Sequence, residues 1–230
     1  MSADQFAVLR QYMLVEIAAE TIYASARIGK AACDQRVMEI LGKVPRHAFV
    51  PAELQPFAYL NRPLPIGFGK TISQPFIVAL MTDLLDLDAN DTVLEIGTGF
   101  GYQTAILAEL AREVYSIDIV EELAREARRR LDGQGYTNIH FKIGNGYYGW
   151  PERGPFDKVI VTAAPDLVPP PLIQQLKPGG KMVIPTGLAD AQKLVMVEKD
   201  RAGKVTIKEI LPVRFSQLEG GQSERTTGDS

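Results

Sequence analysis

The chain has 230 residues, of which 46% are hydrophobic and 23% charged, with a formal net charge of −3 at pH 7. This length allows one large domain, or a domain with an added segment, built on a sizeable core. The charge gives no electrostatic reason for tight binding to nucleic acid or to an anionic membrane, and no run of Lys or Arg supplies one locally.

Cysteine content and the amino-terminal sequence bear on the compartment. Cys33 is the single cysteine, which excludes an intramolecular disulfide and an all-cysteine metal site and fits a reducing compartment. We interpret it as a small buried apolar residue. The segment from Met1 to Ile17 carries charges within its apolar stretch, which argues against a signal peptide and a membrane span. We therefore expect a cytoplasmic protein.

The first third of the chain predicts helices followed by irregular structure. Apolar positions at helical spacing from Gln5 to Leu41 predict two or three helices. Residues 43–73 are rich in Pro and Gly and predict an irregular crossing segment. Residues 74–87 then predict a helix of about three turns, with Pro75 suited to its first turn.

From residue 91 onward, predicted strands and helices alternate. Strands are expected at 91–97, 113–119, 139–144, 156–165 and 179–187, and helices at 101–111, 120–135 and 169–176. Residues 192–200 and 204–215 predict a terminal hairpin. The sequence therefore predicts an α/β fold: a doubly wound, mostly parallel sheet with an N-terminal helical addition and a C-terminal antiparallel hairpin.

A glycine-rich turn follows the first strand of this alternation and opens a helix. Its glycines are Gly97, Gly99 and Gly101, within the segment VLEIGTGFGYQTAILAEL. Bare backbone lets a ligand approach closely, and a helix N-terminus offers free N–H groups and a partial positive charge. A plain tight turn is the alternative, and three glycines in this context make it the weaker interpretation.

Two acids indicate which ligand the turn holds. The spacing here is G-x-G-x-G after Glu95, whereas the dinucleotide fingerprint is G-x-G-x-x-G. A carboxylate there would repel a pyrophosphate but suit S-adenosylmethionine, which carries a sulfonium and an ammonium group. Asp118 ends the next strand about twenty residues on, where an acid can accept both ribose hydroxyls. The order along the chain, an acid, then the glycines, then a second acid, favours S-adenosylmethionine over NAD as the ligand.

Several further blocks resemble the protein-L-isoaspartate O-methyltransferases, a family of class I S-adenosylmethionine-dependent methyltransferases. The matching blocks, which together span roughly residues 35 to 217, are VPRHAFVP (44–51), RPLPIGFGKTISQPFIVALMTDLL (62–85), GPFDKVIVTAAP (154–165), LKPGGKMVIPTG (176–187) and LPVRF (211–215). The segment TISQP is the most specific, because generic methyltransferases lack it. The resemblance implies a Rossmann-like fold.

The implied reaction is methyl transfer from S-adenosylmethionine to the carboxylate of L-isoaspartyl residues in damaged proteins or peptides, leaving S-adenosyl-L-homocysteine. The methyl ester then closes to a succinimide, which can reopen as normal aspartate. A carboxylate near pKa 4 is ionised at pH 7, so the nucleophile needs no general base and positioning supplies most of the advantage. No metal, nucleic acid or membrane is required.

The resemblance also assigns residues. Ser73 is the catalytic candidate, because its hydroxyl could hold one oxygen of the substrate carboxylate. A helix N-cap just before Pro75 is the alternative role for Ser73. The cofactor-binding set is Thr71, Ile72, Ser73, Glu95, Gly97, Thr98, Gly99, Gly101, Asp118, Ile119, Asn145 and Gly146. The substrate groove is assigned to Pro65, Ile66, Gly67, Thr162, Ala163, Ala164, Val213 and Arg214, although Arg214 could equally form a surface ion pair.

The predicted elements, together with the resemblance, indicate a division of the chain. Residues 1–74 are expected to form a helical, substrate-side segment, 75–218 the S-adenosylmethionine-binding catalytic domain, and 219–230 a disordered tail without apolar anchors.

Departures from the family pattern leave alternatives open. Asn145 stands where the family usually has Asp, and Asp118 stands where Glu is common. These changes keep open a related carboxyl methyltransferase that acts on Asp of a dedicated peptide. Asn145 alone also suggests a non-catalytic sensor of adenosyl ligands. An NAD enzyme is disfavoured by Glu95 and the glycine spacing.

Overall fold

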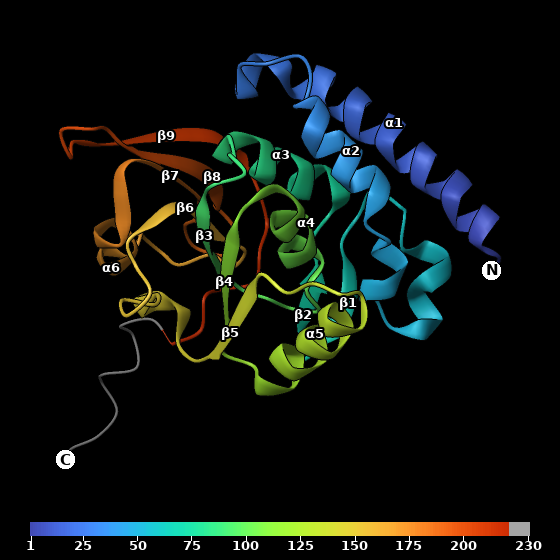
Figure 1. The fold of residues 1–230 in the computed structure, drawn as a ribbon. Helices are drawn as coiled ribbons and strands as arrows, with labels where there is room; N and C mark the ends of the chain where they lie inside the picture. The colour runs from blue at the N-terminus through green and yellow to red at the C-terminus, as the bar shows by residue number, and fades with distance from the viewer. Residues whose placement is uncertain (221–230) are drawn as a thin grey trace.

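A seven-stranded sheet forms the centre of the protein, as the computed structural model of the chain, which describes residues 1–220, shows in Figure 1. Its strand order is β5-β4-β3-β6-β7-β8-β9. The strands are β3 (Thr92–Ile96), β4 (Glu113–Asp118), β5 (Ile139–Ile143), β6 (Phe156–Val161), β7 (Leu176–Thr186), β8 (Lys193–Lys199) and β9 (Val205–Pro212). The pairs from β5 to β7 are parallel, and β8 and β9 pair antiparallel at one edge.

The strand order reverses beside β3, which decides where a ligand can bind. From β3 the chain proceeds outward through β4 to β5, then returns to the other side of β3 with β6 and β7. The connections that leave the carboxyl ends of β3 and β6 therefore lead away from each other and leave a crevice, the place where doubly wound sheets bind ligands. The predicted fold class is confirmed, including the terminal antiparallel hairpin.

Helices cover the sheet and extend it on the amino-terminal side. They are α1 (Ala3–Ile28), α2 (Gln35–Lys43), α3 (Pro75–Leu85), α4 (Tyr102–Leu110), α5 (Glu121–Gly133) and α6 (Pro170–Gln174). Helix α5 packs against β4 and β5, α6 packs against β7, and α1 packs on α2 and α3 along the outer edge of the molecule (Figure 1). Ser2 begins α1 with a capping box to Gln5. Within residues 1–220, no helix is both long and apolar enough to cross a membrane.

The crossing segment is more ordered than its composition predicts. It contains two short 3₁₀ helices, η1 (Arg46–Phe49) and η2 (Ala52–Phe57), and an antiparallel pair, β1 (Leu64–Gly67) with β2 (Lys70–Ile72). Strands this short leave no periodic signal in the sequence. Another 3₁₀ turn, η3 (Gly146–Tyr148), follows β5.

The boundary between this segment and α3 settles the alternative role of Ser73. Helix α3 begins at Pro75, as predicted, but its N-cap residue is Gln74 and no side chain caps it. Ser73 is therefore not the N-cap. The division of the chain at residues 74 and 75 stays a prediction. Of the predicted tail, residues 221–230 lie outside the described residues, whereas Glu219 and Gly220 contact the body of the protein.

Candidate active site

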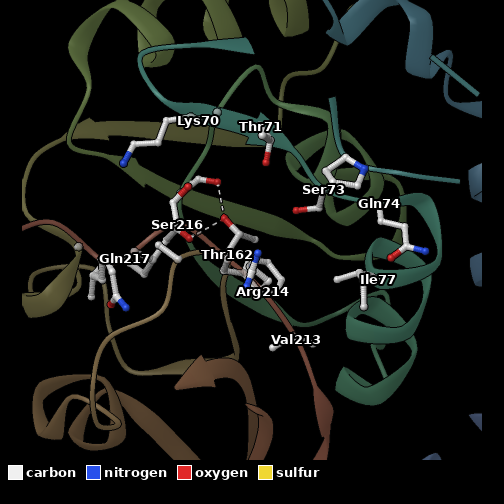
Figure 2. A pocket seen from close by; sticks show the side chains of 18 of the residues that line it. Lys70, Thr71, Ser73, Gln74, Ile77, Thr162, Val213, Arg214, Ser216 and Gln217 are labelled. Carbon is white, nitrogen blue, oxygen red and sulfur yellow. Dashed lines mark hydrogen bonds between the residues drawn. The ribbon is translucent and has the colours of Figure 1, made fainter. Parts of the chain in front are cut away.

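A cavity of about 770 Å³ opens at the carboxyl ends of the parallel strands. Its lining comes from the turns after β3, β4, β5 and β6 and from residues between 70 and 77 and between 211 and 219. Figure 2 shows Arg214 and Ser216 close to Thr162, with Thr71 and Ser73 across from them. Eleven of the predicted site residues line it: Thr71, Ser73, Gly97, Gly99, Asp118, Ile119, Gly146, Thr162, Ala163, Val213 and Arg214. The fold thus gathers residues from both the cofactor and the substrate sets around one space.

The glycine turn at this cavity needs its glycines for two physical reasons. Gly97, Gly99 and Gly101 have φ values of 97°, 56° and 93°, in the left-handed region that side chains disfavour. A Cβ on Gly97 would also lie 2.3 Å from Oγ1 of Thr162. That hydroxyl donates to the Gly97 carbonyl at 2.8 Å, which ties the turn to the end of β6. The turn is therefore held by Thr162, and its glycines present only backbone atoms to the cavity.

Asp118, the last residue of β4, is bound to the same turn. Its Oδ2 accepts from the Gly99 amide at 2.8 Å, and its Oδ1 accepts from the Val120 amide at 2.9 Å. Burial raises the pKa of Asp118, while these two amide donors favour the ionised form and oppose that rise. The carboxylate is thus held in one orientation at the cavity wall.

Glu95 does not line the cavity, and its assignment to the cofactor site stays a prediction. It is fully buried in β3, and its Oε2 accepts from Thr104 of α4 and Ser116 of β4, both at 2.6 Å. Its Oε1 has no hydrogen-bond partner among residues 1–220. Burial raises the pKa of Glu95 to about 8, so this side chain is mostly neutral at pH 7. Through these two hydrogen bonds the Glu95 carboxyl group links the first turn of α4 to β4.

Other predicted residues also stand behind the cavity wall. Ile66 packs against the glycine turn. A Cβ added to Gly99 would lie 3.2 Å from Cδ1 of Ile66. Ala164 exchanges backbone hydrogen bonds of 2.8 and 2.9 Å with Ser216 and Leu218. The predicted residues that do not line the cavity are Pro65, Ile66, Gly67, Ile72, Glu95, Thr98, Gly101, Asn145 and Ala164. The family motif includes these supporting residues, so motif matching alone assigns them to the ligand.

Asn145 has a packing role on the carboxyl-terminal segment. Its Oδ1 accepts from the Tyr147 amide at 2.9 Å, and its Nδ2 donates to the carbonyl of Gly220. Only its neighbour Gly146 reaches the cavity. The side chain that distinguishes this chain from the family pattern therefore holds residues 219 and 220 near the cavity.

Ser73 and Thr71 present hydroxyl groups to the cavity. Figure 2 shows both hydroxyls directed toward the side of the cavity that carries Thr162. The Ser73 hydroxyl has no hydrogen-bond partner within residues 1–220, whereas its carbonyl accepts from Nη2 of Arg46 at 2.7 Å. The backbone of Ser73 is therefore fixed, and its hydroxyl remains available to a ligand.

Sequence reasoning missed several residues of the cavity. Lys70 and Glu219 form an ion pair of 2.5 Å across one side of it. Glu20 of α1 lines it as well, although this helix precedes every motif. Lys70 and Gln74 both lie within the matching block at residues 62–85, so the resemblance could have supplied them. Among residues 1–220, no group of three or more His, Cys, Asp and Glu side chains could hold a metal ion.

A mostly parallel sheet of this order, with a glycine turn and an acid at its strand reversal, defines the Rossmann-like methyltransferase class. A solved protein-L-isoaspartate O-methyltransferase superposes with a TM-score of 0.77 at 26% identity, covering 92% of this chain and 66% of that one. A Plasmodium falciparum structure in complex with S-adenosyl-L-homocysteine shares the fold, with a TM-score of 0.72, 22% identity and coverage of 88% and 96%.

Sequence comparison specifies the family. The model of the protein-L-isoaspartate(D-aspartate) O-methyltransferase family matches residues 20–223. Protein-L-isoaspartate O-methyltransferase 1 of Polaromonas sp. is 65% identical, over 96% of this chain and 94% of its own. Protein-L-isoaspartate O-methyltransferase 2 of Syntrophobacter fumaroxidans is 55% identical, over 95% and 89%. The chain belongs to the protein-L-isoaspartate(D-aspartate) O-methyltransferase family, and the resemblance of its motifs is confirmed.

Proposed function

We propose that this protein transfers a methyl group from S-adenosylmethionine to the carboxylate of L-isoaspartyl residues in damaged proteins or peptides. The observation that carries the proposal is a single cavity that brings Ser73 together with the Gly97–Gly99 turn and Asp118. Its family membership gives the reaction, and the cavity supplies a place for both reactants.

The cavity fits S-adenosylmethionine in size and chemistry. Its volume of about 770 Å³ lies within the usual range of cofactor sites. Gly97 and Gly99 would let the amino-acid part of the ligand lie against backbone, and the Asp118 carboxylate would hold the ribose hydroxyls. Ile96, Ile117 and Leu123 supply apolar surface for the adenine. Bound S-adenosylmethionine supplies an electrophilic methyl group.

The protein's own contribution is to place an anionic oxygen against that group. The Ser73 hydroxyl would donate to one oxygen of the isoaspartyl carboxylate and leave the other free to react. Arg214 gives this side of the cavity positive charge, which favours an anionic substrate group, whereas Lys70 is paired with Glu219. Because the nucleophile arrives ionised, orientation supplies the rate advantage without a general base. The product ester is a better leaving group, so the succinimide forms and repair begins.

The test uses paired peptides that differ only in Asp or isoaspartate, with a labelled methyl donor. We expect the labelled methyl group only in the isoaspartyl peptide. Label in both peptides would show that the enzyme is a general carboxyl methyltransferase. Label confined to the Asp peptide would contradict the proposal and favour the dedicated-peptide alternative. Ser73→Ala should lower kcat by about tenfold or more, as the loss of one donor to a developing interaction does. Ser216→Ala, in the same cavity, is the matched control and should keep near-normal turnover.

We further propose a cytoplasmic enzyme whose partners are isoaspartyl proteins and peptides, without nucleic acid, membrane or metal. The single cysteine and the modest net charge of −3 support this proposal. Retention of activity after treatment with a chelator and after nuclease digestion would be the corresponding check.

A further inference from the structure

A second hollow of about 650 Å³ lies beside the catalytic cavity and opens broadly to solvent. It is formed where α1 meets the residues that follow η2, and its lining residues are Glu16, Ala19, Glu20, Tyr23, Leu60, Asn61 and Arg62. Glu20 lines both this hollow and the catalytic cavity. The two spaces therefore share one wall, and we call the second one the α1 hollow.

The shared wall is a fixed cluster of polar side chains. Oε2 of Glu20 accepts from Nδ2 of Asn61 at 2.6 Å and from Nε2 of Gln74 at 3.1 Å. Oδ1 of Asn61 accepts from the amide of Phe76 at 3.0 Å, at the start of α3. This cluster joins α1 to the residues just after Ser73. A chain that leaves the catalytic cavity over this wall enters the α1 hollow, and two to four extended residues reach roughly 7–14 Å.

The lining of the α1 hollow includes apolar side chains that are exposed to solvent among polar and charged ones. Tyr23 is 91% exposed and Leu60 is 42% exposed, and both lie next to the small side chain of Ala19. Ile22, on the same outer face of α1, is 63% exposed. An exposed aromatic ring beside an exposed leucine offers apolar surface that a bound side chain could cover. Because the α1 hollow adjoins the catalytic cavity, we expect the polypeptide whose isoaspartyl residue is methylated to reach these exposed side chains.

We infer that the α1 hollow binds an apolar or aromatic side chain of the substrate polypeptide, located two to four residues from the isoaspartyl residue. The inference rests on the proposed function and deepens it. Binding along the catalytic cavity can use backbone groups that all peptides share. The α1 hollow adds a preference for substrates that expose apolar side chains near the damage, as locally unfolded segments do.

The test compares isoaspartyl peptides that carry Leu or Ser at one position, moved in turn from two to four residues on either side. At the productive position, wild-type enzyme should show a KM about fivefold lower for the Leu peptide, the gain from partly burying one apolar side chain. The value of kcat should stay the same, because the contact is remote from the reacting carboxylate. Tyr23→Ser should abolish the KM difference and leave kcat and the KM for the Ser peptide unchanged.

Tyr12→Ser is the matched control, because Tyr12 is 66% exposed on the same outer face of α1 but does not line the hollow. It should preserve the preference for Leu. Equal KM values for the Leu and Ser peptides at every position would overturn the inference while leaving the proposed function intact. Equal effects of Tyr12→Ser and Tyr23→Ser, with a wild-type dimer in sedimentation that both variants dissociate, would assign this face to a second copy instead. Failure to methylate any isoaspartyl peptide would defeat the proposed function itself.

Discussion

Arg46, a fully buried residue, donates from Nη2 to the carbonyl oxygen of Ser73 at 2.7 Å. Its Nε donates to the carbonyl of Ala58 at 2.8 Å, and its Cζ lies 4.9 Å from the ring centroid of Tyr102. Burial lowers the pKa of Arg46 to about 10, so it still carries its charge at neutral pH. No carboxylate within residues 1–220 pairs with it. A buried cation thus links Ser73 to the first residue of α4.

Replacing Arg46 by Lys should therefore disturb Ser73 without removing the charge. A lysine has a single nitrogen, which cannot occupy the positions of both Nε and Nη2, so one of the two buried hydrogen bonds is lost. We expect kcat to fall about tenfold and the free energy of unfolding to drop by about 2 kcal/mol. Steady-state kinetics and urea denaturation measure the two effects.

The Ser73→Ala background tests whether Arg46 acts through Ser73. There, Arg46→Lys should reduce kcat much less than in the wild type, because the hydroxyl that it positions is already gone. Full additivity of the two losses in kcat would mean that Arg46 affects catalysis independently of Ser73.

Asp118→Asn should weaken the cofactor site specifically. The amide keeps one acceptor oxygen, so the bonds from the Gly99 and Val120 amides and any bond to a ribose cannot all survive. We expect the Kd for S-adenosylhomocysteine to rise about tenfold or more by calorimetry, the loss of a charge-assisted hydrogen bond. Asp166→Asn, at an exposed acid that does not line the cavity, should leave that Kd unchanged. Equal Kd values for Asp118→Asn and the wild type would exclude Asp118 as the ribose ligand.

Sequence patterns predicted the sheet and the location of the site because both depend on local signals. The alternation of apolar strands with helices predicts the fold, and the sheet has the expected terminal hairpin. The turn from Gly97 to Gly101 and the acid at Asp118 lie together in the structure, because the carboxyl ends of the adjacent strands β3 and β4 meet at one edge of the sheet.

The direction in which individual side chains point could not be predicted in the same way. Glu95 lies in a central strand, and a strand residue faces either the ligand side or the helix side; its spacing to Gly97 does not decide between them. The contacts of Lys70 with Glu219 and of Glu20 with Gln74 join segments far apart in sequence, which a single sequence cannot pair. Tertiary packing, not motif chemistry, determined these positions.

Gly97→Ala should damage the turn more than an ordinary Gly→Ala change. At φ 97° an added Cβ is strained, and it would lie 2.3 Å from Oγ1 of Thr162. We expect a loss of about 2 kcal/mol or more in unfolding free energy and weaker binding of S-adenosylhomocysteine. Gly133→Ala is the matched control, because this residue ends α5 and a Cβ there meets nothing within 4 Å. It should gain up to about 1 kcal/mol through helix propensity. Similar changes in unfolding free energy for both variants would refute the claim that the left-handed φ and the nearby Thr162 hydroxyl require glycine at position 97.

Glu95 should make the stability of the wild-type protein fall as pH rises through the neutral range. Its native pKa of about 8 exceeds the ordinary value of 4.5, so between these values the native state holds a proton that the unfolded chain has released. The stabilisation is complete below about pH 4.5, declines by up to about 1.4 kcal/mol per pH unit, and is lost as pH passes 8.

Glu95→Gln removes this titration while its side-chain oxygen can still accept from Thr104 and Ser116. The unfolding free energy of the variant minus that of the wild type should therefore increase from pH 5 to pH 8 and level off above that range. Urea denaturation at half-unit steps of pH measures the difference, and the exposed Glu122→Gln provides the control. A difference that stays constant with pH would show that Glu95 is ionised in the folded protein, and its buried Oε1 would then need a donor that residues 1–220 do not provide.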